Sequence, residues 1–201
     1  MIFFFWGTKL KLSFSFVALI VLMIILCDES VVLCSLAASL IHECGHLFFM
    51  YIFADIPKYI EFSLFGMRIE NKPDSVVSYR SELLVSLGGI VFNMIFAAIG
   101  FVLYNVFSLY YFAVFSAVNI VVALVNSFPV SVLDCGRAVR CFILMYCKTD
   151  KWEKYAELIS KGFVLIFIVV SLLYFCYCGF NISLLAINLY LILITIIKKW
   201  S

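Results

Sequence analysis

The sequence predicts an all-α membrane protein with about six transmembrane helices and a small β-hairpin between the second and third of them. Its composition is the first reason: hydrophobic residues make up 66% of the 201 residues, charged residues 13%, and the mean hydropathy is +1.18. An ordinary soluble domain is far less apolar. The second reason is that apolar runs of about 20 residues, enough to cross ~30 Å of hydrocarbon as a helix, recur along the chain.

Six apolar runs supply the predicted spans. Lipid offers no partner to open backbone groups, and the runs lack the alternation of a membrane barrel, so each is expected to be a helix. The spans are expected at residues 12–27, 31–53, 83–104, 109–128, 156–178 and 182–197. Little sequence is left over, so residues 1–201 are expected to form a single membrane-embedded domain with no PDZ or CBS domain.

The positive charges fall on one side of this six-span arrangement. All 14 Lys and Arg lie in the amino-terminal segment, the second and fourth connections and the carboxy-terminal tail. Positive residues stay on the cytoplasmic side of short loops, so both termini are expected in the cytoplasm. The net charge of +2 is the sum of these loops and gives no reason to expect nucleic-acid binding. Lys9 and Lys11 before the first apolar run would also suit a signal peptide, but Leu26 is too large for a cleavage site that follows it.

Two polar segments are expected to have their own structure. Residues 59–70 alternate around Gly66, which predicts the β-hairpin at the membrane surface. Residues 135–147 mix Arg137 and Arg140 with large apolar residues, which predicts a short interfacial helix.

The strongest chemical signal is His42-Glu43-Cys44-Gly45-His46, an HExxH motif within the second predicted span. Residues four apart lie on one face of a helix, so the two imidazoles could share a metal ion. The glutamate after the first histidine is then placed to act as a general base toward water. Both histidines of the chain are in this motif. The plainer alternative, histidines that are merely hydrogen-bonded, must meet the cost of placing ionisable groups in a membrane, so metal binding is favoured.

A catalytic zinc site with two histidines needs a third protein ligand. Asp134 is the best candidate, because it lies where the fourth predicted span leaves the membrane. Pro129 lacks an amide hydrogen and ends the helix before it, which lets the chain turn inward. The alternative is that Asp134 is a loop carboxylate or helix cap beside Arg137.

Two amides in apolar segments are further candidates. Asn93 and Asn126 could each hold substrate backbone or stabilise an oxyanion. For Asn93, hydrogen bonding between helices is an equal alternative, and Gly88 and Gly89 would allow the close approach that it needs.

The eight cysteines form no CxxC pair, so a disulfide framework is not expected, although the sequence leaves open whether cysteines near the external face pair. Thiolates bind zinc well, which makes Cys44 and Cys135 alternative ligands. Cys44 is two residues from each histidine and is expected on the opposite side of the helix. Asp134 is therefore preferred.

In order and spacing, these motifs resemble those of the site-2 protease family of intramembrane zinc metalloproteases. The match covers most of the chain. It consists of the HExxH motif, a glycine-containing motif that ends in Asn93, and N-x-x-P followed by L-D-x-G-R around Asp134. The resemblance implies one Zn²⁺ per chain, held by His42, His46 and Asp134, with Glu43 as catalytic base.

The six predicted spans look most like the sporulation-type (stage IV) branch, whose best-known member processes a pro-sigma factor. This implies a bacterial cell membrane. The chain departs from the family pattern at three places: Gly88-Gly89-Ile90 stands for Ala-Gly-Pro, Phe65-Gly66-Met67 for Phe-Gly-Gly, and Cys135 for a glycine. These departures leave the metal-binding motif intact.

The expected function is regulated intramembrane proteolysis: hydrolysis of peptide bonds of membrane-associated substrate proteins in or near the cytoplasmic half of the bilayer. The expected partners are the lipid bilayer and a membrane-associated protein substrate, with no nucleic acid. A regulatory membrane partner or a homo-oligomer is left open. Two alternatives share the metal site: a non-catalytic metal-binding transporter or sensor, and a hydrolase of lipids or small esters.

Overall fold

The structure is a computed structural model, which describes residues 2–5, 8–12, 29–53, 59–63, 66–70, 78–131, 133–146, 150–178 and 188. Its contacts divide the chain into two compact units, Met1–Leu124 and Val125–Ser201. The expectation of a single membrane-embedded domain stays a prediction.

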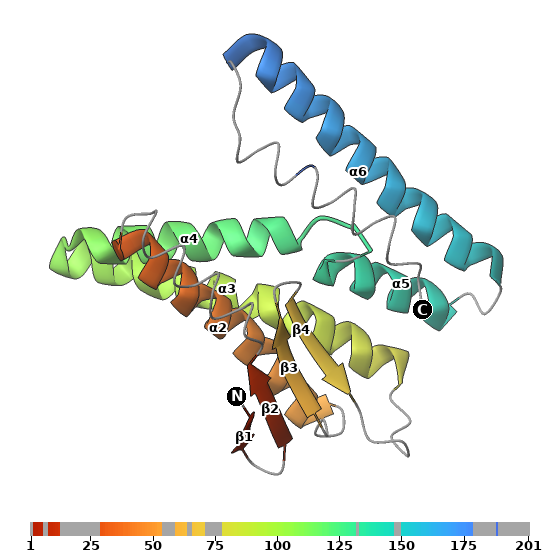
Figure 1. The fold of residues 1–201 in the computed structure, drawn as a ribbon, viewed down its shortest axis with the longest axis horizontal. Coiled ribbons are helices and arrows are strands. Elements are labelled where there is room, and N and C mark those ends of the chain that lie inside the picture. Colours follow the sequence, from red (N-terminus) through yellow and green to blue (C-terminus); the bar gives the residue numbers. More distant parts are fainter. Residues whose placement is uncertain are drawn as a thin grey trace. The chain divides into compact units, whose positions relative to one another are not determined.

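The first unit contains a sheet with the strand order β1-β2-β3-β4 (Figure 1). The strands are β1 (Ile2–Phe5), β2 (Thr8–Leu12), β3 (Tyr59–Ser63) and β4 (Gly66–Glu70). The outer pairs are antiparallel, whereas β2 and β3 are parallel, with Lys9 opposite Tyr59. Parallel neighbours need a long crossover connection. Here the connection between β2 and β3 contains a helix, α2 (Glu29–Phe53).

Helix α2 packs against α3 (Tyr79–Phe107). The two backbones touch at a pair of glycines: a Cβ atom built on Gly45 would lie 2.5 Å from the carbonyl oxygen of Gly88, and one built on Gly88 would lie 2.7 Å from that of Gly45. Small residues allow such close approach between apolar helices. This contact places the middle of α2, with its two histidines, directly against α3.

Helix α4 (Tyr110–Asn126) follows α3 after a short turn. Ser108 adopts the left-handed conformation there, with φ of 54°, and its N–H donates to the Tyr104 carbonyl at 2.7 Å, which caps α3. The two helices are then joined by the Ser116 hydroxyl, which donates to the Ala97 carbonyl at 2.8 Å. Three helices of the first unit thus pack in sequence order through small and polar residues.

The second unit contains α5 (Asp134–Tyr146) and α6 (Asp150–Cys178), which contact each other. The segment before α5 is tied to α6, because the Ser131 N–H donates to the Ser160 hydroxyl at 2.8 Å. Ser160 is only 1% exposed. The amino-terminal end of α5 is therefore anchored to α6.

The expected fold class is wrong in its number of spans. Over the described residues there are five helices, and three of them are long and apolar enough to cross a membrane: Ser30–Phe53, Tyr79–Phe107 and Lys154–Phe175. Helix α4 has 17 residues, about 25 Å at the helical rise, because the chain leaves the helix before Pro129. The expected spans at 13–27 and 182–197 lie outside the described residues, apart from residue 188.

The description as all-α with one small hairpin is also wrong. In the part of the chain that the structure describes, β3 and β4 belong to a four-stranded sheet that includes residues 2–12. The sequence places Leu12 in the first span, whereas it is the last residue of β2. Pairing between β2 and β3 is a contact between distant parts of the chain, which local periodicity does not reveal.

Candidate metal centre

The HExxH motif lies in the middle of α2, and both its histidines are buried, with 7% of His42 and 5% of His46 exposed. The helix turns the intervening Cys44 away, so that this thiol is exposed. This is the arrangement expected from residues i, i+2 and i+4 of a helix. The two imidazoles therefore face the interior of the first unit, and Cys44 does not.

A glycine of α3 leaves room for the imidazoles. A Cβ atom built on Gly89 would lie 2.6 Å from Cε1 and 2.8 Å from Nδ1 of His42, and 2.7 Å from Nε2 of His46. All three distances are shorter than real contacts of a Cβ atom. Any side chain at position 89 would occupy the space that the rings fill. Gly89 is thus required by the site itself, whereas Gly88 is required by helix packing.

The ring nitrogens of His46 have defined roles. Nδ1 lies 2.8 Å from the backbone carbonyl oxygen of Val85 in α3. A carbonyl oxygen only accepts hydrogen bonds, so Nδ1 carries the proton and donates it to Val85. In neutral imidazole the other nitrogen, Nε2, then presents a lone pair.

The His42 ring is also held through Nδ1, in this case by a side chain. Its Nδ1 donates to Oδ1 of Asn93 in α3 at 2.6 Å. Asn93 is fully buried, and its Nδ2 donates to the Ala38 carbonyl at 3.0 Å and to Oδ1 of Asn119 in α4 at 2.8 Å. Of the two interpretations left open for Asn93, these contacts favour hydrogen bonding between helices.

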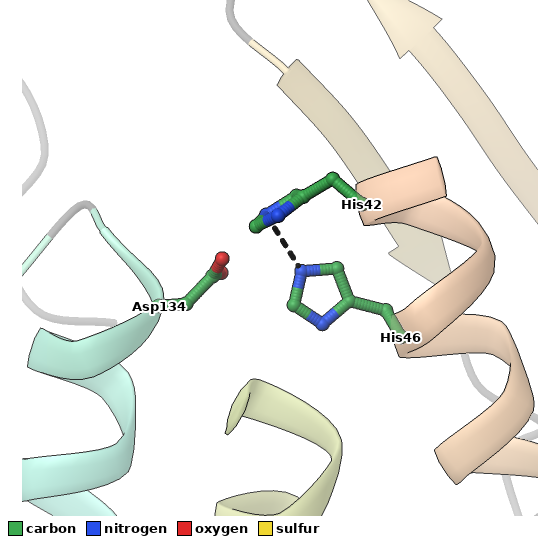
Figure 2. Close-up of side chains that lie close together, drawn as sticks. All are labelled: His42, His46 and Asp134. Atoms are coloured by element: carbon green, nitrogen blue, oxygen red, sulfur yellow. Dashed lines mark hydrogen bonds between the residues drawn. The ribbon is translucent and has the colours of Figure 1, made fainter. Parts of the chain in front are cut away.

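The two Nε2 atoms meet, 3.2 Å apart (Figure 2). Zinc binds imidazole nitrogens at about 2.0–2.1 Å in a tetrahedral arrangement, which separates two such nitrogens by about 3.3 Å. The spacing of the two Nε2 atoms therefore fits a shared zinc ion. A metal-binding histidine usually donates its other N–H to a carbonyl or carboxylate, and each of these rings does so to an amide oxygen.

Asp134 is the first residue of α5 and is 3% exposed. Its Oδ1 accepts a hydrogen bond from Nη2 of Arg137 at 2.5 Å. The turn before it is tight, because a Cβ atom built on Gly136 would overlap the Val130 carbonyl oxygen. Gly136 therefore lets the chain fold back over the start of α5, which explains the glycine of the L-D-x-G-R motif.

Three of the predicted site residues, His42, His46 and Asp134, each offer one ligand atom within 4.8 Å of the others, so they could hold a metal ion (Figure 2). Two imidazoles and a carboxylate are a donor set of catalytic zinc sites, which keep a further position open. The structure thus offers a His-His-Asp group of the composition that the sequence predicts.

Two other predicted site residues, Glu43 and Asn126, are not members of this group of three. Glu43 follows His42 in α2 and is half-buried, and Asn126 is half-buried at the end of α4. Their roles as base and as substrate or oxyanion contact stay predictions. Burial raises the pKa of the Cys135 thiol, and the neighbouring Asp134 carboxylate raises it further.

Sequence reasoning missed three parts of the site: Asn119, the Val85 carbonyl and the need for glycine at position 89. Asn119 carried a usable signal, because an amide within an apolar helix is costly unless it is bonded. The Val85 carbonyl carried none, because a backbone group leaves no mark on residue type.

The sequence matches no protein-family model and none of the curated proteins. Among solved structures, the chain is similar to a site-2 protease from Methanocaldococcus jannaschii, with a TM-score of 0.67 and 19% sequence identity. The alignment covers 95% of this chain and 91% of the other. The two proteins share a fold. At 19% identity the similarity concerns the fold alone.

Proposed function

We propose that this chain is an intramembrane zinc metalloendopeptidase of the site-2 protease type. The observation that carries the proposal is the orientation of the two histidines in α2. Their Nδ1 atoms are held by oxygens of α3, and their Nε2 atoms meet 3.2 Å apart. The chain also shares the fold of a site-2 protease, which is compatible with this function.

In this proposal His42, His46 and Asp134 hold one Zn²⁺ per chain. Zinc, when bound, acts as a Lewis acid that polarises the scissile carbonyl and makes water more acidic. The histidines act as neutral ligands because each keeps its proton on Nδ1, and Arg137 orients the Asp134 carboxylate through Oδ1. Glu43 takes the proton of the attacking water and passes it to the leaving amine.

We further propose that the substrates are membrane-associated proteins cleaved in or near the cytoplasmic half of the bilayer. Cleavage within the membrane is supported by the HExxH motif, which lies within Ser30–Phe53, one of the three helices able to cross a membrane. A bacterial cell membrane, cytoplasmic termini and the sporulation-type branch remain parts of the proposal that rest on the sequence resemblance and charge distribution.

The decisive experiment compares the native protein with Glu43→Gln during co-expression with candidate membrane-tethered substrates. Glutamine keeps the size of the side chain but cannot accept the proton, so cleavage should fall by about 10²- to 10⁴-fold. Zinc content, measured on the purified proteins, should stay at one ion per chain. Glu82→Gln is the matched control, because Glu82 is an exposed residue of the first turn of α3.

Unchanged cleavage by Glu43→Gln would refute the catalytic role. The alternative of a metal transporter or sensor predicts that no membrane-tethered protein is cleaved by either form. A lipid or ester hydrolase predicts Glu43-dependent turnover of small esters without cleavage of any protein substrate.

A further inference from the structure

Two fully buried asparagines connect α3 and α4, and one of them reaches a candidate metal ligand. Asn93 and Asn119 are both 0% exposed. Their hydrogen bonds form a continuous chain from α4 to His42. Which group donates in each bond follows from the backbone carbonyls along the chain, because a carbonyl oxygen can only accept.

The orientation of the Asn119 side-chain amide follows from its backbone partner. Its Nδ2 donates to the backbone carbonyl of Phe115 at 2.8 Å, in the preceding turn of α4. Because a carbonyl oxygen can only accept, the NH₂ end of the amide must face Phe115. The oxygen of Asn119 is then the end that faces Asn93.

Asn93 is fixed by two acceptors. Its Nδ2 donates to Oδ1 of Asn119 at 2.8 Å and to the Ala38 carbonyl at 3.0 Å. These bonds use both hydrogens of the amide, so Oδ1 is the end that faces His42. An amide oxygen has no hydrogen to give, and the 2.6 Å bond therefore needs the proton on Nδ1 of His42.

We propose that Asn93 and Asn119 are positioning residues that set the tautomer of His42. In this chain of hydrogen bonds, called the relay below, the backbone carbonyls of Phe115 and Ala38 hold the NH₂ groups of Asn119 and Asn93. Oδ1 of Asn93 then accepts a hydrogen bond from Nδ1 of His42, so that Nε2 of His42 carries the lone pair that a metal needs. The inference rests on the metal-binding part of the proposed function and is independent of proteolysis. His46 needs no such relay, because its Nδ1 donates directly to the Val85 carbonyl.

The relay predicts an asymmetry between the two histidines. Asn93→Leu keeps a similar volume but removes the acceptor for His42 and leaves that of His46 in place. Asn93→Asp keeps an oxygen acceptor in either protonation state. Asn119→Ala removes the group that orients Asn93. Ser116→Ala is the matched control, because it removes a buried hydrogen bond between α4 and α3 that does not touch the relay.

The first measurement reads the tautomer directly in the metal-free protein. The chain has only two histidines, so ¹⁵N-histidine NMR of protein in micelles, purified through a tag without histidine, reports on this site alone. We expect both rings of the native protein and of Ser116→Ala to carry the proton on Nδ1. In Asn93→Leu one ring should lose this preference, and in Asn93→Asp both should keep it.

The second measurement is zinc affinity, by competition with a chromophoric chelator. Asn93→Leu should bind zinc about 10- to 100-fold more weakly, as expected when an outer partner of a ligand is lost. Asn119→Ala should weaken binding in the same direction, and Ser116→Ala should leave it unchanged.

Two outcomes would overturn the relay: ring-nitrogen signals of Asn93→Leu identical to those of the native protein, or an equal loss of zinc in Ser116→Ala. If Asn93→Leu fails to fold, Asn119→Ala is judged by the same two readouts. Neither readout involves cleavage, so a failure of Glu43→Gln to abolish proteolysis would refute the proposed function and leave this inference standing.

Discussion

Replacement of Gly89 by alanine tests whether the two imidazoles are positioned as described. The new Cβ atom would lie 2.6 Å from Cε1 of His42 and 2.7 Å from Nε2 of His46. Optimal contacts between such atoms are about 3.5 Å, so the His42 ring would have to move by roughly 0.9 Å. Zinc–ligand distances tolerate about 0.2 Å. The methyl group therefore displaces at least one ring beyond coordinating geometry.

The expected loss of zinc affinity is large because both imidazole rings are held by hydrogen bonds. His42 Nδ1 is bonded to Asn93 at 2.6 Å and His46 Nδ1 to the Val85 carbonyl at 2.8 Å, so moving a ring also breaks its outer bond. Loss of such an outer partner alone weakens metal binding by about 10- to 100-fold. We expect Gly89→Ala to lower zinc affinity by at least this factor. Catalytic turnover should fall about 100-fold, as misplacement by about 1 Å can cause.

The assay is chelator competition for zinc in detergent micelles, with circular dichroism to follow helix content. Gly162→Ala in α6 is the control, because a Cβ atom there meets nothing within 4 Å. At position 162, where the methyl group fits, loss of a helical glycine favours the folded state by about 0.4–1 kcal/mol. We expect helix content to be kept in both variants and zinc binding to be lost only at position 89. A Gly89→Ala protein with native zinc affinity would refute the described ring positions.

Three further predictions concern Asp134, Cys44 and the tight turn at Gly136. Asp134→Ala should reduce bound zinc below one ion per chain in metal analysis, and an unchanged content would remove Asp134 from the ligand set. Cys44→Ser should keep the full zinc content and activity, because Cys44 is exposed on the far side of α2 from the histidines; zinc loss in this variant would contradict that placement. Gly136→Ala should lose activity and zinc together, because its Cβ atom would overlap the Val130 carbonyl oxygen and must displace the start of α5; a fully active variant would show that this turn is not needed.

The sequence predicts that His42 and His46 lie together because helix geometry links the spacing of residues to their position. Residues four apart must share a face, so the HExxH motif by itself places His42 and His46 together. The placement of Cys44 follows from the same periodicity. Asp134 is predicted from its motif and from its position at the end of an apolar run, and it is the third member of the group that could hold a metal ion.

Contacts between distant parts of the chain are what the sequence does not reveal. The parallel pairing of β2 with β3 depends on residues about 50 positions apart, and the runs themselves show only local patterns. The partner of an intramembrane amide is similarly hidden. Asn93, Asn119 and Asn126 each stand out as amides in apolar segments, but the sequence does not show that Asn119 bonds to Asn93. The number of spans is wrong at α4, because the apolar composition of residues 109–128 suggests a full span whereas the helix ends at Asn126, before Pro129.

The amide of Asn93 also constrains how its helix can move. It bonds to α2 at two points and to α4 at a third, and successive residues of a helix are turned by about 100°. Rotation of α3 about its own axis by one residue position would break all three of these hydrogen bonds. The buried amide therefore opposes rotation of α3 relative to α2 and α4.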